Sequence, residues 1–224
     1  MLTYKIHLIR HGLTKGNVGG KYIGRTDLPL CEEGIEELKK LKNKYEYPSA
    51  QMVVSSPLKR CLQTADILYP DLYTEKWEDF VELDFGAFEG KGIEELQHDE
   101  HFSKWLESGM QNPPPGGESG LDLTKRISVG ISRLFKKMMD EQLGSVALIT
   151  HGGVIMNLLY GMGLPKCEIS QWAVDNGKGY TILMTPQFWM RDRAFEVYAP
   201  LPYGLSQDEV QMDTLRFTKP GEKA

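Results

Sequence analysis

Short apolar segments alternate with longer amphipathic segments along most of the chain. The apolar runs at 4–9, 52–55 and 146–150 have the length of buried strands, and later runs at 180–185 and 194–198 resemble them. Between these runs, apolar residues recur at every third or fourth position with charged residues between them, as in amphipathic helices. Helices are predicted at 32–45, 58–68, 94–106, 121–139 and 154–160. This alternation predicts the α/β class, with a mostly parallel central sheet and helices on both faces.

Two of the predicted helices have recognisable starts. Ser119 is a suitable N-cap for the helix at 121–139, with Asp122 three residues further on. Pro57 fits the first turn of the helix at 58–68, because proline lacks the N–H that the first turn of a helix leaves unpaired. Both signals support the predicted boundaries.

The chain has the length and composition of one domain. It has 224 residues, of which 41% are hydrophobic and 25% are charged, and no linker rich in Pro, Ser or Gly divides it into halves. We therefore predict a single domain over residues 1–200. Residues 201–224 have weak periodicity and are predicted to form a C-terminal tail or a contact with a partner.

Charge and cysteine content narrow the function classes and the compartment. The net charge of −5 argues against a general nucleic-acid-binding protein but leaves room for a local basic pocket. No apolar run approaches the roughly 18 residues of a membrane span, and we find no signal peptide. The three cysteines are far apart, as free thiols would be. We predict a cytoplasmic protein whose partner is a small molecule, with no nucleic acid and no membrane involved.

Three predicted strands end next to residues that bind anions. The first strand ends in Arg10 and His11, Arg60 lies in the helix after the second strand, and His151 follows the strand at 146–150. Ligands of open α/β sheets bind beyond the carboxyl ends of the strands, so these side chains converge if the strands are neighbours. Two guanidinium groups and two imidazoles in one cleft predict a phosphate site.

A phosphate site that contains a histidine can also perform phosphoryl transfer. His11 is the candidate nucleophile, because a neutral ring nitrogen can form a phosphohistidine and the charges of Arg10 and Arg60 should lower its pKa. A carboxyl group is then needed to protonate the leaving oxygen and later to deprotonate the attacking water. The candidates within residues 80–90 are Glu82, Asp84 and Glu89.

Several segments together resemble one family of phosphate-transferring enzymes. They are RHGLTKGN at 10–17, GRTDLPL at 24–30, SSPLKRCLQTA at 55–65, ELDFGAFEG at 82–90, PGGES at 115–119 and THGG at 150–153. With these segments in the family's order, the chain resembles the histidine phosphatase superfamily, in its phosphoglycerate mutase-like branch, over roughly residues 4–185. The resemblance implies a phosphoglycerate mutase-like three-layer sandwich with a helical cap inserted at about 86–120.

The resemblance implies a role for each residue of the predicted phosphate site. His11 would be the phosphorylated nucleophile. Arg10, Arg60 and His151 would hold the phosphoryl oxygens. Further phosphate-binding positions would be the side chain of Asn17, the backbone at the entrance formed by Ile23 and Gly24, and Gly152.

The resemblance also implies the acid and the absence of a metal. Glu82 would be the general acid and base, with Asp84 as the alternative, because some relatives use an aspartate shifted along this loop. Leu13 stands where Glu or Gln is commonest in the family. No metal ion or other cofactor is implied. His98 and His101 lie three residues apart in a charged helix without a third ligand at a fitting spacing, so we expect a solvated face there.

The sequence favours a hydrolase over a mutase. A mutase must hold a bisphosphate, but the segment at 82–110, which should cover the mouth of the site, has eight carboxylates against Lys91 and Lys104. We therefore predict a metal-independent phosphomonoester hydrolase that acts through a phosphohistidine on a small phosphorylated metabolite. The segments at 24–30 and 172–177 look most like those of alpha-ribazole phosphatases, so alpha-ribazole 5′-phosphate is the candidate substrate.

Two other functions are alternatives on the same fold. A cofactor-dependent phosphoglycerate mutase would isomerise phosphoglycerate when a bisphosphate is supplied. A non-catalytic module would bind a phosphorylated ligand without turnover. Trp105 could face an aromatic leaving group, but we expect it to pack within its helix, as buried tryptophans usually do. The sequence is compatible with a homodimer.

Overall fold

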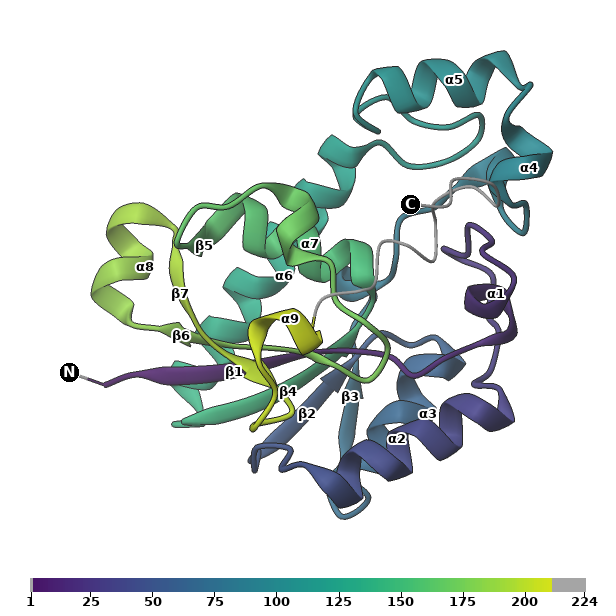
Figure 1. Cartoon of the computed structure of the whole chain (residues 1–224). Coiled ribbons are helices and arrows are strands. Elements are labelled where there is room, and N and C mark those ends of the chain that lie inside the picture. The colour runs from purple at the N-terminus through teal and green to yellow at the C-terminus, as the bar shows by residue number, and fades with distance from the viewer. Residues whose placement is uncertain (1, 211–224) are drawn as a thin grey trace.

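A mixed β-sheet forms the centre of the computed structural model, which describes residues 2–210 (Figure 1). Within these residues the strand order is β3-β2-β4-β1-β6-β7-β5. The strands are β1 Tyr4–Arg10, β2 Met52–Ser55, β3 Thr74–Lys76, β4 Ser145–Thr150, β5 Gly163–Leu164, β6 Gly179–Met184 and β7 Phe195–Leu201. Only β6 runs antiparallel to its neighbours, β1 and β7, whereas the other four neighbouring pairs of the described sheet are parallel. The predicted mostly parallel sheet is confirmed.

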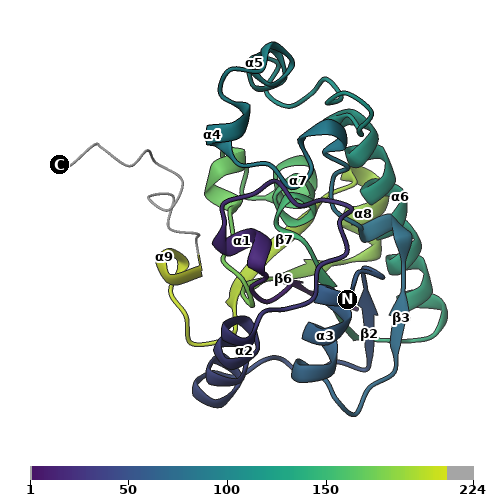
Figure 2. The same cartoon turned by 90° about the vertical axis from the view of Figure 1, so that its right-hand side faces the viewer.

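Helices cover both faces of this sheet (Figures 1 and 2). One face carries α2 (Glu32–Lys44) and α3 (Lys59–Leu68), and the other carries α6 (Gly120–Asp140) and α7 (Gly152–Met162). The shorter helices are α1 Lys15–Val18, α4 Ile93–Leu96, α5 Glu100–Glu107, α8 Pro186–Asp192 and α9 Gln207–Val210, with 3-10 turns η1 Glu78–Phe80, η2 Gly86–Phe88 and η3 Ile169–Trp172. Within residues 2–210, no helix has the length and apolar character needed to cross a membrane.

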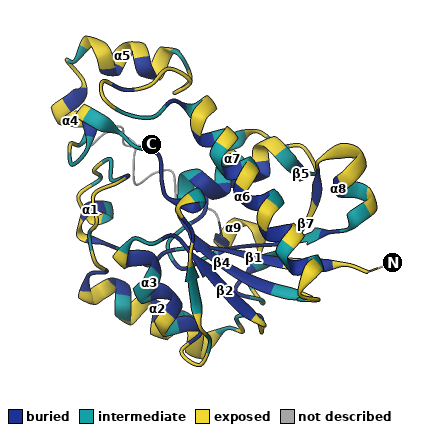
Figure 3. Ribbon diagram, turned by 180° about the vertical axis from the view of Figure 1, so that it is seen from behind, coloured by how far each residue is buried: buried dark blue, intermediate teal, exposed yellow. Residues whose placement is uncertain are grey.

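The central strands are apolar at successive positions because both of their faces are covered (Figure 3). Leu8 and Leu148 pack in the cluster that includes α6 and α7. Their neighbours Ile9 and Ile149 point to the opposite face and pack in the cluster that includes α2 and α3. All four side chains are fully buried. The short apolar runs of the sequence are thus buried strands at the middle of three layers.

The segment predicted as one helix at 94–106 is two helices, α4 and α5. The carboxylate of Asp99 accepts hydrogen bonds from the backbone N–H groups of His101 (2.8 Å) and Phe102 (3.4 Å), so it caps α5 and ends the preceding turn. The prediction of an uninterrupted helix was therefore wrong. Figures 1 and 2 show α4 and α5 standing away from the sheet, on the side where α1 follows β1.

The predicted helix starts are right in one case and wrong in the other. Ser119 caps α6, since its hydroxyl accepts a hydrogen bond from the backbone N–H of Asp122 at 3.1 Å. Leu58 is the N-cap of α3, so Pro57 lies just outside the helix and not in its first turn. The elements β3, β5 and α8 were not predicted.

The first ten residues of the predicted C-terminal tail, 201–210, make contacts with the rest of the domain. Leu201 is the last residue of β7, and the backbone N–H of Tyr203 donates to the carbonyl of Glu46 at 2.8 Å. Val210 is buried, and its carbonyl accepts from the N–H of Asp175 at 3.0 Å. Both ends of the segment at 201–210 are therefore attached to the domain, while residues 206–209 between them are exposed. The rest of the predicted tail, 211–224, lies outside the described residues.

A histidine lies within the core of the sheet, on β1. The ring of His7 is 1% exposed, with Nδ1 at 2.9 Å from Thr181 Oγ1 and Nε2 at 2.9 Å from Ser145 Oγ. Burial, and then the charge of Lys5, lowers the pKa of His7 to about 4. The folded protein therefore keeps this imidazole neutral where the unfolded chain would protonate it.

We expect this histidine to make the protein less stable in acid. Between pH 6.5 and about 4, the unfolded state binds a proton at His7 that the folded state does not bind, so the free energy of unfolding should fall by about 3 kcal/mol as the pH falls through this window. Urea unfolding at a series of pH values measures the decline. His7→Gln keeps polar atoms for both neighbours and should decline less steeply, whereas equal slopes would contradict the expectation.

Candidate active site

The carboxyl ends of three adjacent strands lie together at one edge of the sheet. β2, β4 and β1 are consecutive neighbours, and Arg10 on β1 pairs in register with Thr150 on β4. The backbone N–H of His11 donates to the carbonyl of Thr150 at 2.9 Å, and that of Ser56 donates to the carbonyl of Ile149 at 3.0 Å. The turns that follow the three strands are therefore hydrogen-bonded into one unit, in the place where the sequence predicted an anion site.

Hydrogen bonding fixes the tautomer of His11, which is 5% exposed. Its Nδ1 lies 2.7 Å from the carbonyl oxygen of Gly12, which can only accept, so Nδ1 carries the proton and Nε2 carries the lone pair. The N–H of Gly12 donates to Thr64 Oγ1 at 2.9 Å and so ties this turn to α3. Burial, and then the charges of Arg60 and Arg10, lower the pKa of His11 well below its ordinary value. The result is a neutral imidazole with an available nitrogen.

A second neutral imidazole lies beside the first. The rings of His11 and His151 are 5.2 Å apart between centroids, with an interplanar angle of 66°. His151 is fully buried, and its Nε2 lies 2.8 Å from Ser56 Oγ. Burial, followed by the charge of Arg60, lowers the pKa of His151 well below its ordinary value. The two histidines predicted from distant parts of the sequence are thus in ring contact.

Arg60 is a buried cation, 1% exposed, in the first turn of α3. Its Nη1 donates to the carbonyl of Thr26 at 2.8 Å and its Nη2 donates to the carbonyl of Gly24 at 2.7 Å. Within residues 2–210, its buried Nε makes no hydrogen bond. Because a buried N–H without a partner is costly, an anion bound at this nitrogen would be stabilised.

Arg10 lies next to the start of α7. Its Nη1 donates to the carbonyl of Val174 at 2.6 Å, and a Cβ added at Gly152 would lie 3.3 Å from its Nε. Burial lowers the pKa of Arg10, while the carboxylates of Asp175 and Glu82 act in the opposite direction. Because the charge of Glu82 raises the pKa of Arg10, the predicted general acid lies close enough to interact electrostatically with this guanidinium.

Glu82 and Asp84 occupy different environments. Glu82 is 8% exposed, and its two oxygens accept hydrogen bonds from the N–H of Leu83 (2.9 Å) and from the N–H of Gly153 (2.9 Å) in the first turn of α7. Asp84 is half-buried, and its Oδ1 accepts from the N–H of Gly86 at 2.9 Å within its own turn. Glu82 therefore lies at the helix start that follows His151, which favours it over Asp84 as the acid.

Two further predicted phosphate-binding residues, Asn17 and Ile23, lie at α1: Asn17 belongs to this helix, and Ile23 packs against it. Asn17 forms a capping box with Thr14, in which Asn17 Oδ1 accepts from the backbone N–H (3.1 Å) and the hydroxyl (2.9 Å) of Thr14. The hydrogen bonds of the Asn17 side chain within residues 2–210 use only its Oδ1. Its Nδ2 amide group can therefore donate to a phosphate oxygen. The side chain of Ile23 packs against Gly16 of α1. The phosphate-binding role of both positions stays a prediction.

Comparison with known proteins identifies the family. The profile of the histidine phosphatase superfamily (branch 1) matches residues 6–194. The chain belongs to this superfamily. Adenosylcobalamin/alpha-ribazole phosphatase of Escherichia coli (strain K12) is 28% identical over 178 residues, which cover 77% of this chain and 86% of the relative. Phosphoserine phosphatase 1 of Hydrogenobacter thermophilus is 28% identical over 185 residues, with 80% of this chain and 85% of the relative covered.

A solved structure with a similar fold is titled phosphoglycerate mutase, from Bacillus anthracis. It superposes with a TM-score of 0.72 at 21% identity, and the match covers 88% of this chain and 92% of the solved chain. This similarity confirms the predicted phosphoglycerate mutase-like α/β fold. Superfamily relatives include phosphatases, which supports a hydrolase.

Gly153 is the residue that lets Glu82 approach α7 in this histidine phosphatase. A Cβ added at Gly153 would lie 2.4 Å from Glu82 Oε1, which is closer than real contacts allow. Any side chain there would have to push the carboxylate away from the N-terminus of the helix. The glycine is therefore required by a close approach and not by its backbone angles.

We expect Gly153→Ala to lower kcat about 10²-fold, because displacement of a catalytic group by about 1 Å has an effect of that size. Steady-state kinetics with an aryl phosphate would measure the loss. Gly161→Ala is the matched control, since it lies in the same helix and an added Cβ meets nothing within 4 Å. Equal kcat values in the two variants would contradict the proposed approach of Glu82 to the helix.

Ser56, Thr64 and Asn176 are among the residues that contact the site and were not predicted. Ser56 lies against His151, Thr64 accepts from the turn after His11, and Asn176 Nδ2 donates to the carbonyl of His11 at 2.9 Å. Ser56 and Thr64 belong to the segment SSPLKRCLQTA at 55–65, which was assigned to the site through Arg60 alone. Asn176 lies in the segment at 172–177, which the resemblance linked only to the substrate and not to a contact with a residue 165 positions earlier.

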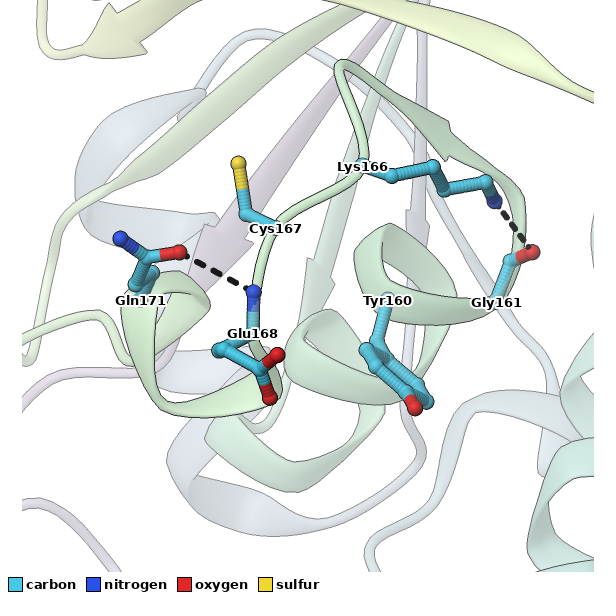
Figure 4. A pocket seen from close by; sticks show the side chains of 6 residues that line it. All are labelled: Tyr160, Gly161, Lys166, Cys167, Glu168 and Gln171. Atoms are coloured by element: carbon cyan, nitrogen blue, oxygen red, sulfur yellow. Dashed lines mark hydrogen bonds between the residues drawn. The ribbon is translucent and has the colours of Figure 1, made fainter.

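An open hollow lies at the opposite end of α7 (Figure 4). Its volume is about 610 Å³, and it is lined by Tyr160, Gly161, Lys166, Cys167, Glu168 and Gln171. Lys166 Nζ donates to the carbonyl of Gly161 at 2.9 Å. The predicted catalytic groups flank the start of this 11-residue helix, about 15 Å away at 1.5 Å per residue. The hollow is therefore separate from the candidate site.

Trp105 packs among aromatic rings at the segment of residues 86–120, which contains α4 and α5 and is called the cap below. It is 1% exposed, and its ring centroid lies between 5.6 and 6.0 Å from those of Tyr22, Phe85, Phe88 and Phe102. This arrangement supports the packing interpretation. The cluster joins α5 to the loop at Tyr22 and to the segment around η2.

The two cap histidines are not on one helical face. His98 lies in the turn between α4 and α5, His101 lies in α5, and both are exposed. The sequence interpretation of a shared helix was wrong because Asp99 starts a new helix between them. Within residues 2–210, no three His, Cys, Asp or Glu side chains are grouped so that they could hold a metal ion.

Proposed function

We propose that this superfamily member is a phosphomonoester hydrolase that acts through a phosphohistidine at His11, without a metal ion, on a small phosphorylated metabolite. The observation that supports this most strongly is the tautomer of His11, in which Nδ1–H donates a hydrogen bond to the Gly12 carbonyl and Nε2 keeps its lone pair. The guanidinium groups of Arg10 and Arg60 supply positive charge near this nitrogen. That combination suits in-line attack on phosphorus.

In the first step, His11 Nε2 attacks the phosphorus and forms an N–P bond while the bond to the leaving oxygen breaks. Arg10, Arg60 and His151 stabilise the charge on the three equatorial oxygens. Glu82 in its acid form donates its proton to the leaving oxygen, so that the product is a neutral alcohol. Glu82 is left as a carboxylate, which the N–H groups of Leu83 and Gly153 hold in place.

In the second step, water attacks the phosphohistidine. The carboxylate of Glu82 accepts a proton from this water as the new O–P bond forms and the N–P bond breaks. Inorganic phosphate leaves, and His11 returns to its neutral form with the proton still on Nδ1. Glu82 is again protonated for the next cycle.

Water is a better candidate acceptor than a second phosphorylated metabolite. A mutase needs cations that hold a second phosphate, and the segment at 82–110 has a strong excess of carboxylates over its two lysines. Glu89 is one of these carboxylates, and its oxygens accept hydrogen bonds from the loop at 24–26. It therefore does not pair with either lysine to make a second phosphate site. Alpha-ribazole 5′-phosphate is our first candidate substrate, supported by the segments at 24–30 and 172–177 and by the name of one relative.

A substrate panel tests this proposal. The purified protein, in the presence of a chelator, is incubated with alpha-ribazole 5′-phosphate, O-phosphoserine, an aryl phosphate, and 3-phosphoglycerate with and without 2,3-bisphosphoglycerate. We expect chelator-resistant release of inorganic phosphate, fastest from alpha-ribazole 5′-phosphate. Bisphosphate-dependent isomerisation faster than hydrolysis would identify a mutase. Binding of these compounds without turnover would identify a non-catalytic module.

A further inference from the structure

Glu89 holds the loop at the entrance of the candidate site. Its Oε1 accepts hydrogen bonds from the backbone N–H of Gly24 at 2.9 Å and from that of Arg25 at 2.8 Å. Its Oε2 accepts from the hydroxyl of Thr26 at 2.7 Å and shares the N–H of Gly24 at 3.2 Å. A fourth donor, the N–H of Phe85, lies 3.4 Å from Oε1. One carboxylate thus gathers three consecutive residues that lie more than 60 positions earlier in the chain.

The same loop holds Arg60 from the other side. The carbonyl of Gly24 accepts from Arg60 Nη2 and the carbonyl of Thr26 accepts from Nη1, at 2.7 and 2.8 Å. Residues 24–26 belong to no helix or strand, so no ladder of backbone hydrogen bonds fixes these carbonyls. Besides the N–H of Leu28, which donates to the Thr26 carbonyl at 3.0 Å, the carboxylate on the N–H side of this loop is the group that orients these carbonyls toward the guanidinium.

The loop also fits tightly against its surroundings. A Cβ added at Gly24 would lie 1.8 Å from the carbonyl oxygen of Leu83 and 2.6 Å from Glu89 Oε1. Leu83 directly follows Glu82, so the loop, Glu89 and the segment of the general acid are packed on one another. A small displacement of the loop would move the acceptors of Arg60, and with them a buried cation that cannot relax into solvent.

We infer that Glu89 is a positioning residue, which sets the location of Arg60 through the loop at 24–26 and thereby controls phosphate affinity. This inference rests on the proposed phosphate-binding role of Arg60. It assigns no proton transfer to Glu89, because four donors occupy its oxygens. It also links the base of the cap, where Glu89 lies, to the charge that binds the phosphoryl group.

A double-mutant cycle with Arg60 tests the inference. Glu89→Gln keeps the size of the side chain but replaces one acceptor oxygen with a donor, so it should weaken binding of inorganic phosphate about tenfold or more. In an Arg60→Met background, where the positioned cation is absent, Glu89→Gln should change this affinity less than about twofold. An equal loss in both backgrounds would overturn the inference, because Glu89 would then act independently of Arg60. No loss in the wild-type background would also overturn it.

The control is Glu95→Gln in the same part of the chain. The Glu95 carboxylate accepts from the N–H of Gly92 at 2.9 Å and caps α4, without contact to the loop at 24–26. Phosphate affinity should stay unchanged in this variant. A loss as large as that of Glu89→Gln would mean that disturbance of the cap, and not the link to Arg60, explains the effect, which would overturn the inference.

A milder substitution decides the matter if Glu89→Gln does not fold. Thr26→Val removes only the hydroxyl that donates to Glu89 and keeps the shape of the side chain. We expect about threefold weaker phosphate binding, coupled to Arg60 in the same cycle. An uncoupled effect, or none, would overturn the inference. The proposed function has its own test in the same experiment: it would be wrong if Arg60→Met alone left phosphate binding and hydrolysis unchanged.

Discussion

His11→Ala should lower the turnover of a phosphomonoester at least about 10³-fold, because the covalent route through phosphohistidine disappears with the ring nitrogen. The substitution leaves the cations of Arg10 and Arg60 in place. We therefore expect inorganic phosphate to bind with an affinity within about tenfold of the wild type, so that the loss is in kcat and not in binding. This separation distinguishes a lost nucleophile from a collapsed site.

Rapid quenching measures the same step directly. Wild-type protein mixed with an aryl phosphate and quenched in alkali should contain a phosphohistidine, because N–P bonds of this kind survive base and hydrolyse in acid. His11→Ala should give none. His98→Ala is the control, since this exposed cap histidine should retain both the signal and full turnover. Undiminished turnover by His11→Ala would refute the proposed mechanism. Full labelling of that variant would move the nucleophile elsewhere.

The predicted site residues that the apolar pattern itself brings together lie at or just after the ends of apolar strands, whereas Glu82, Asn17, Ile23 and Gly24 were predicted through the family resemblance. Arg10 is the last residue of β1, and His11 and His151 directly follow β1 and β4. A parallel sheet brings such ends together whatever the distance between them in sequence. Arg60 could be included because the next helix begins right after β2. The apolar runs also located the central strands, because a strand that is covered by helices on both faces needs apolar side chains at successive positions.

The parts that could not be predicted depend on single polar contacts between distant segments. Asp99 ends one helix and starts another, and local periodicity of the surrounding residues does not reveal that choice. Glu89 and Glu82 look equivalent in the segment at 82–90, but one binds a loop and the other binds the start of α7. β3 escaped prediction because an edge strand of three residues, two of them charged, lacks an apolar pattern.

The tautomer of His11 follows from the three-dimensional structure and not from the sequence. The sequence suggests a neutral imidazole near two arginines, but it does not say which nitrogen is available. The 2.7 Å contact with the Gly12 carbonyl decides this, because the acceptor belongs to the next residue of the turn. The glycine at position 12 is itself needed there, since an added Cβ would lie 2.5 Å from a methyl carbon of Leu38.

Glu82→Gln should have an effect that depends on the leaving group. Gln keeps an oxygen that can accept from the N–H of Gly153, so the site should remain folded and should still bind phosphate. It has no proton to give to an alkoxide, so kcat/KM for an alkyl phosphate should fall about 10²- to 10⁴-fold. An aryl phosphate with an acidic phenol needs little protonation when it leaves, so its first step should be much less affected.

This asymmetry predicts accumulation of the phosphorylated enzyme. With an aryl phosphate, Glu82→Gln should form phosphohistidine at a rate near that of the wild type but hydrolyse it slowly, because the base that activates water is missing. A burst of phenol release followed by a slow steady state would reveal this, with alkali-stable label on the protein. Asp84→Asn is the matched control, because its carboxylate binds Gly86 within its own turn and should leave both steps within about twofold of the wild type. If Asp84→Asn gave the burst and Glu82→Gln did not, the general acid would be Asp84. The contact of Glu82 with the start of α7 would then serve only to stabilise the fold.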